Sequence, residues 1–301
     1  MKRIDELSLG WRTDLIFPRF DAQVIERPQY LVVRTPHNPT FYWGNFLLFD
    51  RAPVEGDAAA WLAAFDAEIA SRQPASRHVA FGIDAAQPWP VPADLAVAGL
   101  ALDASTVLTM RAEQLRAPTR TLGPPFSVRA LDLPAEEALA VELQVASDEG
   151  GFEPNGYRVF RQRQMQRYGA MVAAGRGDWF GVFATSSVAA TATSTTTTTA
   201  SESPAHPGGP PLVADCGLFT DGRGLGRFQF VSTHPLWRRR GLCTALTHAV
   251  CRHGFGTLGL HTLVIVADPD DVAIGLYESL GFERGETTWH LERRPAGDAE
   301  S

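Results

Sequence analysis

The chain has 301 residues, of which 45% are hydrophobic and 20% are charged, and its net charge at pH 7 is −7. This length predicts two domains or one large domain, with enough apolar residues to build a core. The acidic balance argues against general affinity for nucleic acids or anionic membranes, which requires a broad basic surface, and it weakly favours a cationic or neutral substrate.

The first half of the sequence predicts five elements in the order strand, helix, strand, helix, strand. Their residues are 40–50, 58–71, 78–84, 92–103 and 105–115. In the first helix, Trp61, Phe65 and Ile69 fall on one apolar face. The aromatic and Asn-containing run at 35–45 fits either the lining of a substrate groove or, as the favoured interpretation, a packed inter-domain face.

The second half begins after "LGPP", residues 122–125, which we interpret as a linker. From Phe126 onwards the order is strand, two helices, three strands, helix, strand, helix and a closing strand. Their residues are 126–133, 134–147, 157–175, 178–185, 212–220, 227–233, a helix from Leu242, 261–268, 271–282 and 287–293.

One segment of the second half stands apart in composition. Residues 184–212 lack periodicity and consist mainly of Thr, Ser, Ala, Pro and Gly, which predicts a disordered insertion. A mobile lid is one interpretation. A tolerated loop insertion is the favoured one, because long surface loops cost little closure entropy.

The three cysteines, Cys216, Cys243 and Cys251, are too few and too irregularly spaced for a disulfide framework or a zinc site, so we expect no metal. An odd count is typical of a reducing compartment. The N-terminus lacks the uninterrupted apolar run of a signal peptide, and no window reaches the roughly 18 apolar residues of a membrane span. We therefore expect a cytoplasmic protein.

The stretch "FVSTHPLWRRRGLCTALTHAVCRH", residues 230–253, runs from a strand through three arginines and Gly241 into a helix. A helix N-terminus presents unpaired backbone N–H groups with the positive end of the helix dipole behind them, which favours an anion. A glycine lets a phosphate approach the amides, and arginines add positive charge. The stretch therefore predicts a phosphate site, with a solvated basic turn as the alternative. Neither the nucleotide-triphosphate loop nor the dinucleotide fingerprint is present.

This stretch resembles the acyl-CoA motif of the Gcn5-related N-acetyltransferase superfamily, Arg/Gln-x-x-Gly-x-Gly/Ala. Arg238, Gly241 and Cys243 occupy its fixed positions, and Cys243 departs from the pattern because cysteine is larger than Gly or Ala. For Gly241, the alternative is an ordinary glycine at a helix start. For Cys243 and Cys251, packing as small apolar side chains is favoured over nucleophilic chemistry.

A second segment, "AIGLYESLGF" at 273–282, resembles the superfamily's A-x-x-L-Y-x-x-x-G-F motif. The matching residues are Ala273, Leu276, Tyr277, Gly281 and Phe282, whereas Asp270 stands where Asn is frequent. Spacing alone also allows Tyr277 to be a core aromatic of an amphipathic helix.

The resemblance implies a fold and a domain organisation. The expected fold is α/β, with a central mixed, mostly antiparallel sheet flanked by helices, and residues 125–301 would form the catalytic domain. Residues 1–124 would be a degenerate second copy, because "DLAVAGL" echoes "DVAIGLY" with Leu100 opposite Tyr277 and no Arg-x-x-Gly-x-Gly run precedes it. Such a copy is expected to support the active one rather than to catalyse.

The resemblance also implies roles for individual residues. Backbone groups of Val231, Ser232 and Thr233 would contact the pantetheine arm of acetyl-CoA. Arg238, the first fixed residue of the motif, follows them in the sequence. The pyrophosphate would be bound by the amides of Arg239, Arg240, Gly241, Leu242, Cys243 and Thr244. Tyr277 would protonate the departing thiolate, since a phenol with a pKa near 10 stays protonated at neutral pH. Asp215, His234 and Glu153 are candidate bases, although a structural role is favoured for each.

The sequence thus predicts an N-acetyltransferase that moves acetyl from acetyl-CoA to an amine of a small molecule or peptide, as a monomer or homodimer without nucleic-acid or membrane partners. The alternative is a non-catalytic acyl-CoA-binding regulatory module. The acceptor, the acyl-chain preference and the general base do not follow from the sequence.

Overall fold

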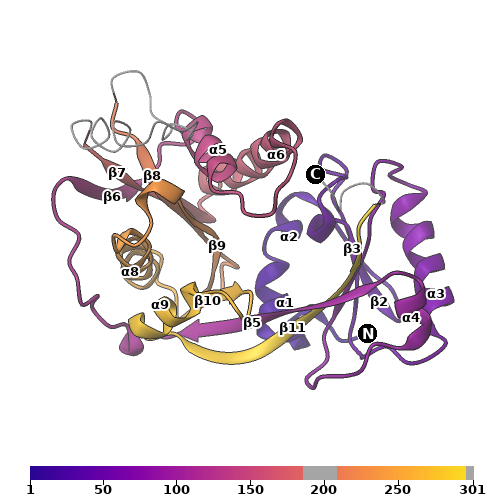
Figure 1. Ribbon diagram of the computed structural model, residues 1–301. Coiled ribbons are helices and arrows are strands. Elements are labelled where there is room, and N and C mark those ends of the chain that lie inside the picture. Colours follow the sequence, from indigo (N-terminus) through magenta and orange to yellow (C-terminus); the bar gives the residue numbers. More distant parts are fainter. Residues whose placement is uncertain (186–208, 296–301) are drawn as a thin grey trace. The chain divides into compact units, whose positions relative to one another are not determined.

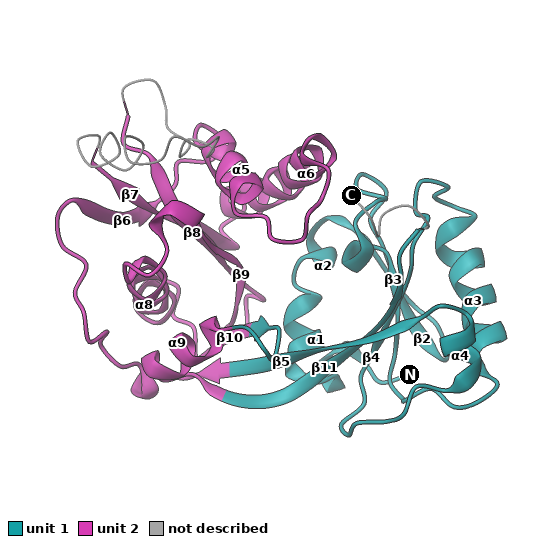
Figure 2. Cartoon of the chain, in the orientation of Figure 1, with its two compact units in different colours: residues 1–108, 266–271, 284–301 teal, residues 109–265, 272–283 magenta. Residues whose placement is uncertain are grey.

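The computed structural model of the chain describes residues 1–185 and 209–295 (Figure 1). The core of the predicted insertion, 186–208, lies outside the described residues. The chain divides into two units, coloured separately in Figure 2. Unit 1 comprises Met1–Leu108, Val266–Asp271 and Arg284–Ser301, and unit 2 comprises Thr109–Ile265 and Val272–Glu283.

The two units depart from the predicted ranges 1–124 and 125–301 because of the last strand. β11 (Glu283–Arg293) follows the final helix of unit 2 in sequence but pairs antiparallel with β4 (Val79–Ile83) of unit 1, with Leu291 opposite Phe81. The chain also leaves unit 1 at Leu108, before the predicted linker at 122–125. A strand that returns from the far end of the chain has no local signal in the sequence.

Unit 1 has the strand order β1-β2-β3-β4-β11-β5. β1–β2, β2–β3 and β4–β11 pair antiparallel, and β3–β4 pair parallel. A parallel pair needs a crossover connection, which α3 provides. Its other elements are α1 (Leu9–Asp14), α2 (Pro18–Asp21), β1 (Gln23–Glu26), β2 (Tyr30–Arg34), β3 (Phe46–Phe49), α3 (Asp57–Phe65), α4 (Ala93–Val97) and β5 (Ala101–Met110).

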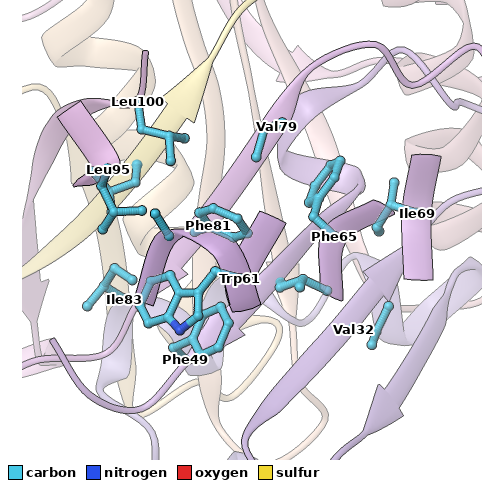
Figure 3. Packing of buried hydrophobic residues seen from close by; sticks show 13 residues of the cluster. Val32, Phe49, Trp61, Phe65, Ile69, Val79, Phe81, Ile83, Leu95 and Leu100 are labelled. Carbon is cyan, nitrogen blue, oxygen red and sulfur yellow. The ribbon is translucent and has the colours of Figure 1, made fainter. Parts of the chain in front are cut away.

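The sheet of unit 1 is covered on both faces, because neighbouring residues of a strand point to opposite sides. In β2, Val32 packs into a cluster with α3 and α4, whereas Leu31 and Val33 pack with Trp11 of α1. Figure 3 shows the first cluster, in which the Trp61 ring lies flat on Phe49 with centroids 3.7 Å apart. The predicted apolar face of the first helix is confirmed.

Some predictions for unit 1 were wrong in detail. The strand predicted at 40–50 begins only at Phe46, because Asn45 holds the preceding chain in a turn by donating from Nδ2 to the Phe41 carbonyl at 2.8 Å. The helix predicted at 92–103 ends at Val97, since Gly99 adopts φ +77° and the chain enters β5. The elements of residues 1–34 were missed.

Unit 2 has the strand order β10-β9-β8-β7-β6. β6 to β9 pair antiparallel in sequence order and β10 pairs parallel with β9. The elements, in the predicted order, are β6 (Phe126–Ala130), α5 (Glu137–Ala146), α6 (Pro154–Ala173), β7 (Gly177–Ala184), β8 (Leu212–Thr220), β9 (Leu225–Thr233), α8 (Leu242–Gly256), β10 (Thr262–Ala267) and α9 (Ala273–Leu280).

Helices cover both faces of this sheet, with α5 and α6 on one side and α8 on the other (Figure 1). Two neighbouring residues of β8 show why. Asp215 accepts a hydrogen bond from Gln144 of α5, whereas Cys216 lies near Cys243 and Cys251 of α8, and burial raises the Cys216 pKa. The predicted mixed, mostly antiparallel sheet flanked by helices is confirmed. No helix among residues 1–185 and 209–295 is long and apolar enough to cross a membrane.

Candidate functional site

The strand β9 is bulged immediately before the segment predicted to contact the pantetheine arm. Asp215 is paired with Ser232 and Gly217 with Gln229, so two steps along β8 correspond to three along β9. Phe230 takes up the extra residue at φ +47°, a left-handed conformation that is rare outside glycine. A bulge of this kind bends a strand and re-aims its side chains.

The register of β9 with its parallel neighbour β10 covers only the first residues of β9. The register with β10 joins Leu225–Arg227 to Thr262–Val264, and Val231, Ser232 and Thr233 lie further along β9. Backbone N–H and C=O groups at an unpaired strand edge can bind an extended ligand as an additional strand would. The buried Ser232 hydroxyl points towards Asp215, so by strand alternation Val231 and Thr233 face the α8 side.

A short turn leads from β9 into α8. It contains a 3₁₀ turn at Pro235–Trp237, with Trp237 buried, and it ends at Gly241, the N-cap residue of α8 at φ +78°. The first helical hydrogen bond runs from the Ala245 N–H to the Gly241 carbonyl. The amides of Leu242 and Thr244 therefore have no intrahelical acceptor, and the N-cap side chain supplies none.

Gly241 keeps the space in front of these amides open. Among the described residues, no heavy atom lies within 4 Å of the position that a Cβ on Gly241 would take. Arg239, two residues earlier, also adopts a left-handed conformation at φ +63°. Left-handed residues in a turn can direct successive backbone N–H groups towards one side, an arrangement that favours anions.

The three arginines occupy different positions around this turn. Arg238 donates from Nε to the Thr233 carbonyl at 3.2 Å and pairs with Glu149. The Arg240 guanidinium lies 4.8 Å from the centroid of the Trp237 ring, and both it and Arg239 are exposed. Arg238 thus connects the end of β9 to the loop before α6. Arg239 and Arg240 supply positive charge at the surface.

Tyr277 lies on α9, the helix that contacts α8. Its side chain is 4% exposed and its ring meets Phe282 edge-on at 6.1 Å, while Phe282 packs against Phe228 of β9 at 6.0 Å. Gly281 ends the helix at φ +109°, where a Cβ would come within 2.0 Å of the Gln114 carbonyl. The glycine of the second motif is therefore required by close backbone packing.

The three candidate bases are all held in structural interactions. Asp215 is fully buried and accepts from the Ser232 hydroxyl at 2.5 Å and from Gln144 Nε2 and Trp179 Nε1 at 2.9 Å each. The His234 Nδ1 accepts from the Leu236 N–H in the turn. Glu153 caps α6, and the backbone N–H groups of Asn155 and Gly156 lower the pKa of its carboxyl.

The polar network around Asp215 was missed from the sequence. It connects Arg161 of α6 through Gln144 to Asp215, since Arg161 Nε donates to Gln144 Oε1 at 2.8 Å. A signal was available, because Tyr157, Arg161, Gln164, Met165 and Tyr168 share one helical face, and the last four of these are buried. Two polar residues on an otherwise apolar face indicate a buried polar site.

The network predicts a pH-dependent stability. Burial raises the pKa of Asp215 to about 6, whereas the unfolded value is about 3.9. The native state therefore binds this proton more tightly than the unfolded state does. Protonation of Asp215 stabilises the native state fully below about pH 4, and this contribution is lost as the pH rises to about 6. Asp215→Asn removes this titration and can still accept from Gln144 and Trp179 while donating to Ser232.

We expect Asp215→Asn to gain stability relative to the unmodified chain between about pH 4 and pH 7, by an amount on the order of 3 kcal/mol. Urea unfolding of both proteins at several pH values measures this difference. A difference that does not change with pH would contradict the raised pKa of Asp215.

Comparison with known proteins agrees with this geometry. The family model described as FR47-like protein matches residues 218–291, which include β9, the turn, α8 and α9. Comparison with curated proteins finds no match. Among solved structures, a GCN5-related N-acetyltransferase from Kribbella flavida is 15% identical, with a TM-score of 0.60 over 95% of this chain and 94% of that one.

Two further structures share the fold along nearly the whole length. A conserved protein of unknown function from Staphylococcus epidermidis has a TM-score of 0.66 at 12% identity, covering 92% of this chain and 95% of that one. A tandem GNAT protein from the clavulanic acid biosynthesis pathway has a TM-score of 0.54 at 14% identity, covering 96% and 93%. The family model covers only residues 218–291, and the solved structures show that the chain has the fold of Gcn5-related N-acetyltransferases.

Proposed function

We propose that this protein is an N-acetyltransferase that transfers acetyl from acetyl-CoA to an amine. The observation that carries the proposal is the junction of β9 and α8, where the part of β9 that lies beyond its register with β10 leads to a helix N-terminus with open space at Gly241. The pantetheine arm and pyrophosphate of acetyl-CoA fit this arrangement. The strand backbone can bind the amide groups of the arm, and the helix N-terminus can bind the negative charge of the pyrophosphate.

In the proposed complex, the backbone of Val231–Thr233 binds the pantetheine arm and the amides of Leu242–Thr244 bind the pyrophosphate. Arg239 and Arg240 add positive charge beside it. Cys243 sits at the third motif position as a half-buried residue of α8, and its small side chain is compatible with this role. Among the described residues, no group of three or more His, Cys, Asp or Glu side chains could hold a metal ion.

The reaction proceeds by attack of the neutral amine on the thioester carbonyl. A C–N bond forms, the tetrahedral intermediate carries negative charge on oxygen, and its collapse breaks the C–S bond. We propose that Tyr277 gives its proton to the departing thiolate, while the amine proton leaves to water. Asp215 is excluded from direct contact with the acceptor by its complete burial and instead positions Ser232.

We further propose that the N-terminal part of the chain is a degenerate copy that binds no acetyl-CoA. No Arg-x-x-Gly-x-Gly run precedes α3, the helix that would correspond to α8. α3 begins after Gly56, and its residues Trp61 and Phe65 pack in the core of unit 1. The expected stoichiometry is one acetyl-CoA per chain, which calorimetry measures directly.

Incubation of the protein with acetyl-CoA and a panel of amines, with detection of released thiol, tests the proposed activity. We expect thiol release that depends on the amine. Tight binding of acetyl-CoA without thiol release for any acceptor would instead support a non-catalytic acyl-CoA-binding module.

A further inference from the structure

A buried guanidinium lies against the bulge of β9. Arg161 of α6 is 4% exposed, and its guanidinium carbon is 3.4 Å from the centroid of the Phe230 ring. Its Nε donates to Gln144, but its buried Nη2 has no hydrogen-bond partner among the described residues. A buried charged donor without an acceptor is costly, and native structures usually provide a partner for it.

Among the described residues, no carboxylate accepts a hydrogen bond from Arg161 Nη2. Asp215 is hydrogen-bonded to Arg161 through Gln144, and it already accepts hydrogen bonds from three side chains. Burial lowers the pKa of Arg161, but an arginine remains charged at neutral pH. The arrangement therefore holds a fixed positive charge with one donor group that is ready for an external anion.

The place of Arg161 along the proposed acetyl-CoA site indicates which anion this is. The pyrophosphate would lie at Leu242–Thr244 and the pantetheine arm would run back along β9 from Thr233 to Val231. The thioester end of the arm therefore lies towards Phe230, the residue on which Arg161 is stacked. This step rests on the proposed function.

Aromatic side chains surround the guanidinium on the α6 side. Tyr157 and Phe160 lie 5.5 Å and 5.7 Å from it, and Tyr157 stacks on Phe152, which is 48% exposed. An apolar surface that reaches solvent at Phe152 and ends at a buried positive charge suits a molecule with an apolar body and a carboxylate.

We infer that Arg161 binds the carboxylate of the acyl acceptor, so that the acceptor is an amino acid with an apolar side chain. Arg161 Nη2 would donate to the carboxylate, the side chain of the acceptor would lie against Phe152 and Tyr157, and its amine would be held near the thioester. The acidic balance of the whole chain, which weakly favours a cationic or neutral substrate, does not determine the charge at this buried position.

Matched acceptors test this assignment in the unmodified protein. L-phenylalanine, 2-phenylethylamine and L-phenylalaninamide share the ring and the amine, and only the first carries a carboxylate. We expect kcat/KM for L-phenylalanine to exceed both others by about 10- to 150-fold, the range for one hydrogen bond to a charged group. The amine is more basic and the amide less basic than the amino acid, so a preference over both is not an effect of amine basicity. Equal use of the three would overturn the assignment.

Variants connect the preference to Arg161. Arg161→Met is expected to reduce the ratio between L-phenylalanine and 2-phenylethylamine to near one, and Arg161→Lys to lower it partially, because lysine keeps the charge but loses the fork. Arg158→Met is the matched control, since Arg158 lies one turn earlier on α6 and already pairs with Glu142 at 2.7 Å. A ratio that survives Arg161→Met or Arg161→Lys unchanged would refute the role of Arg161.

Two further measurements separate this inference from the proposed activity and from another source of carboxylate. Calorimetry with CoA-loaded protein should show that N-acetyl-L-phenylalanine binds more tightly than N-acetyl-2-phenylethylamine in an Arg161-dependent manner. That result supports the carboxylate site even if no acceptor releases thiol. A preference for succinyl-CoA over acetyl-CoA with 2-phenylethylamine would assign Arg161 to the acyl group and overturn the acceptor assignment.

Discussion

Tyr277→Phe is expected to lower kcat by at least about 10²-fold while leaving the affinity for acetyl-CoA nearly unchanged. The variant keeps the ring that contacts Phe282 and the packing of α9, but it removes the proposed proton donor. General acid catalysis contributes typically about 10²–10⁴-fold, and a group that acts only in the transition state affects kcat rather than binding.

The measurement is steady-state turnover beside a thermal melt and an acetyl-CoA titration of the same preparation. Tyr168→Phe is the matched control, because Tyr168 is another buried tyrosine of unit 2, stacked on Trp179 of β7 at 4.9 Å. We expect it to change stability without a comparable loss of kcat. Near-normal kcat in Tyr277→Phe would mean that Tyr277 is a core aromatic and that another group protonates the thiolate.

Gly241→Val is expected to abolish measurable binding of acetyl-CoA, with at least about a 10²-fold loss of affinity. The new side chain would occupy the open space in front of the helix amides, and a branched residue is strained at φ +78°. Loss of two hydrogen bonds to a charged group, at about 1.5–3 kcal/mol each, is sufficient for this effect.

Gly259→Val separates the loss of the anion site from backbone strain. Gly259 also has a positive φ, +64°, with no atom within 4 Å of an added Cβ among the described residues, but it follows the C-terminus of α8. Calorimetry should show unchanged affinity for this control and none for Gly241→Val. Full binding by folded Gly241→Val would contradict the phosphate assignment.

The fold of unit 2 could be predicted well because its signals are local. The amphipathic stripe of α8, the alternation in β8 and β9, and Gly281 after α9 each fix an element from a few neighbouring residues. The position of β11 in unit 1 could not be predicted in this way, since its pairing with β4 joins segments about 200 residues apart in sequence.

The candidate site divides along the same line. The turn at Gly241 follows from consecutive residues, whereas the bulge at Phe230 arises from the register of two strands and has no signature in "RFQFVST". The contact of Arg161 with Phe230 and Gln144 depends on how α5 and α6 pack on the sheet. The sequence therefore predicted the β9–α8 junction, which is proposed to bind acetyl-CoA. It did not predict the contact of Arg161 with β9, which is proposed to bind the acceptor.

The most direct test of acetyl transfer is to follow the acetyl group itself. Acetyl-CoA labelled with ¹³C at the acetyl carbonyl can be incubated with the protein and L-phenylalanine, and the label can be followed by NMR. We predict that the signal moves from the thioester to an amide, at a rate that falls sharply in Tyr277→Phe. Label that stays on CoA, or that appears only as free acetate, both with L-phenylalanine and with every amine of the panel, would contradict acetyl transfer to an amine.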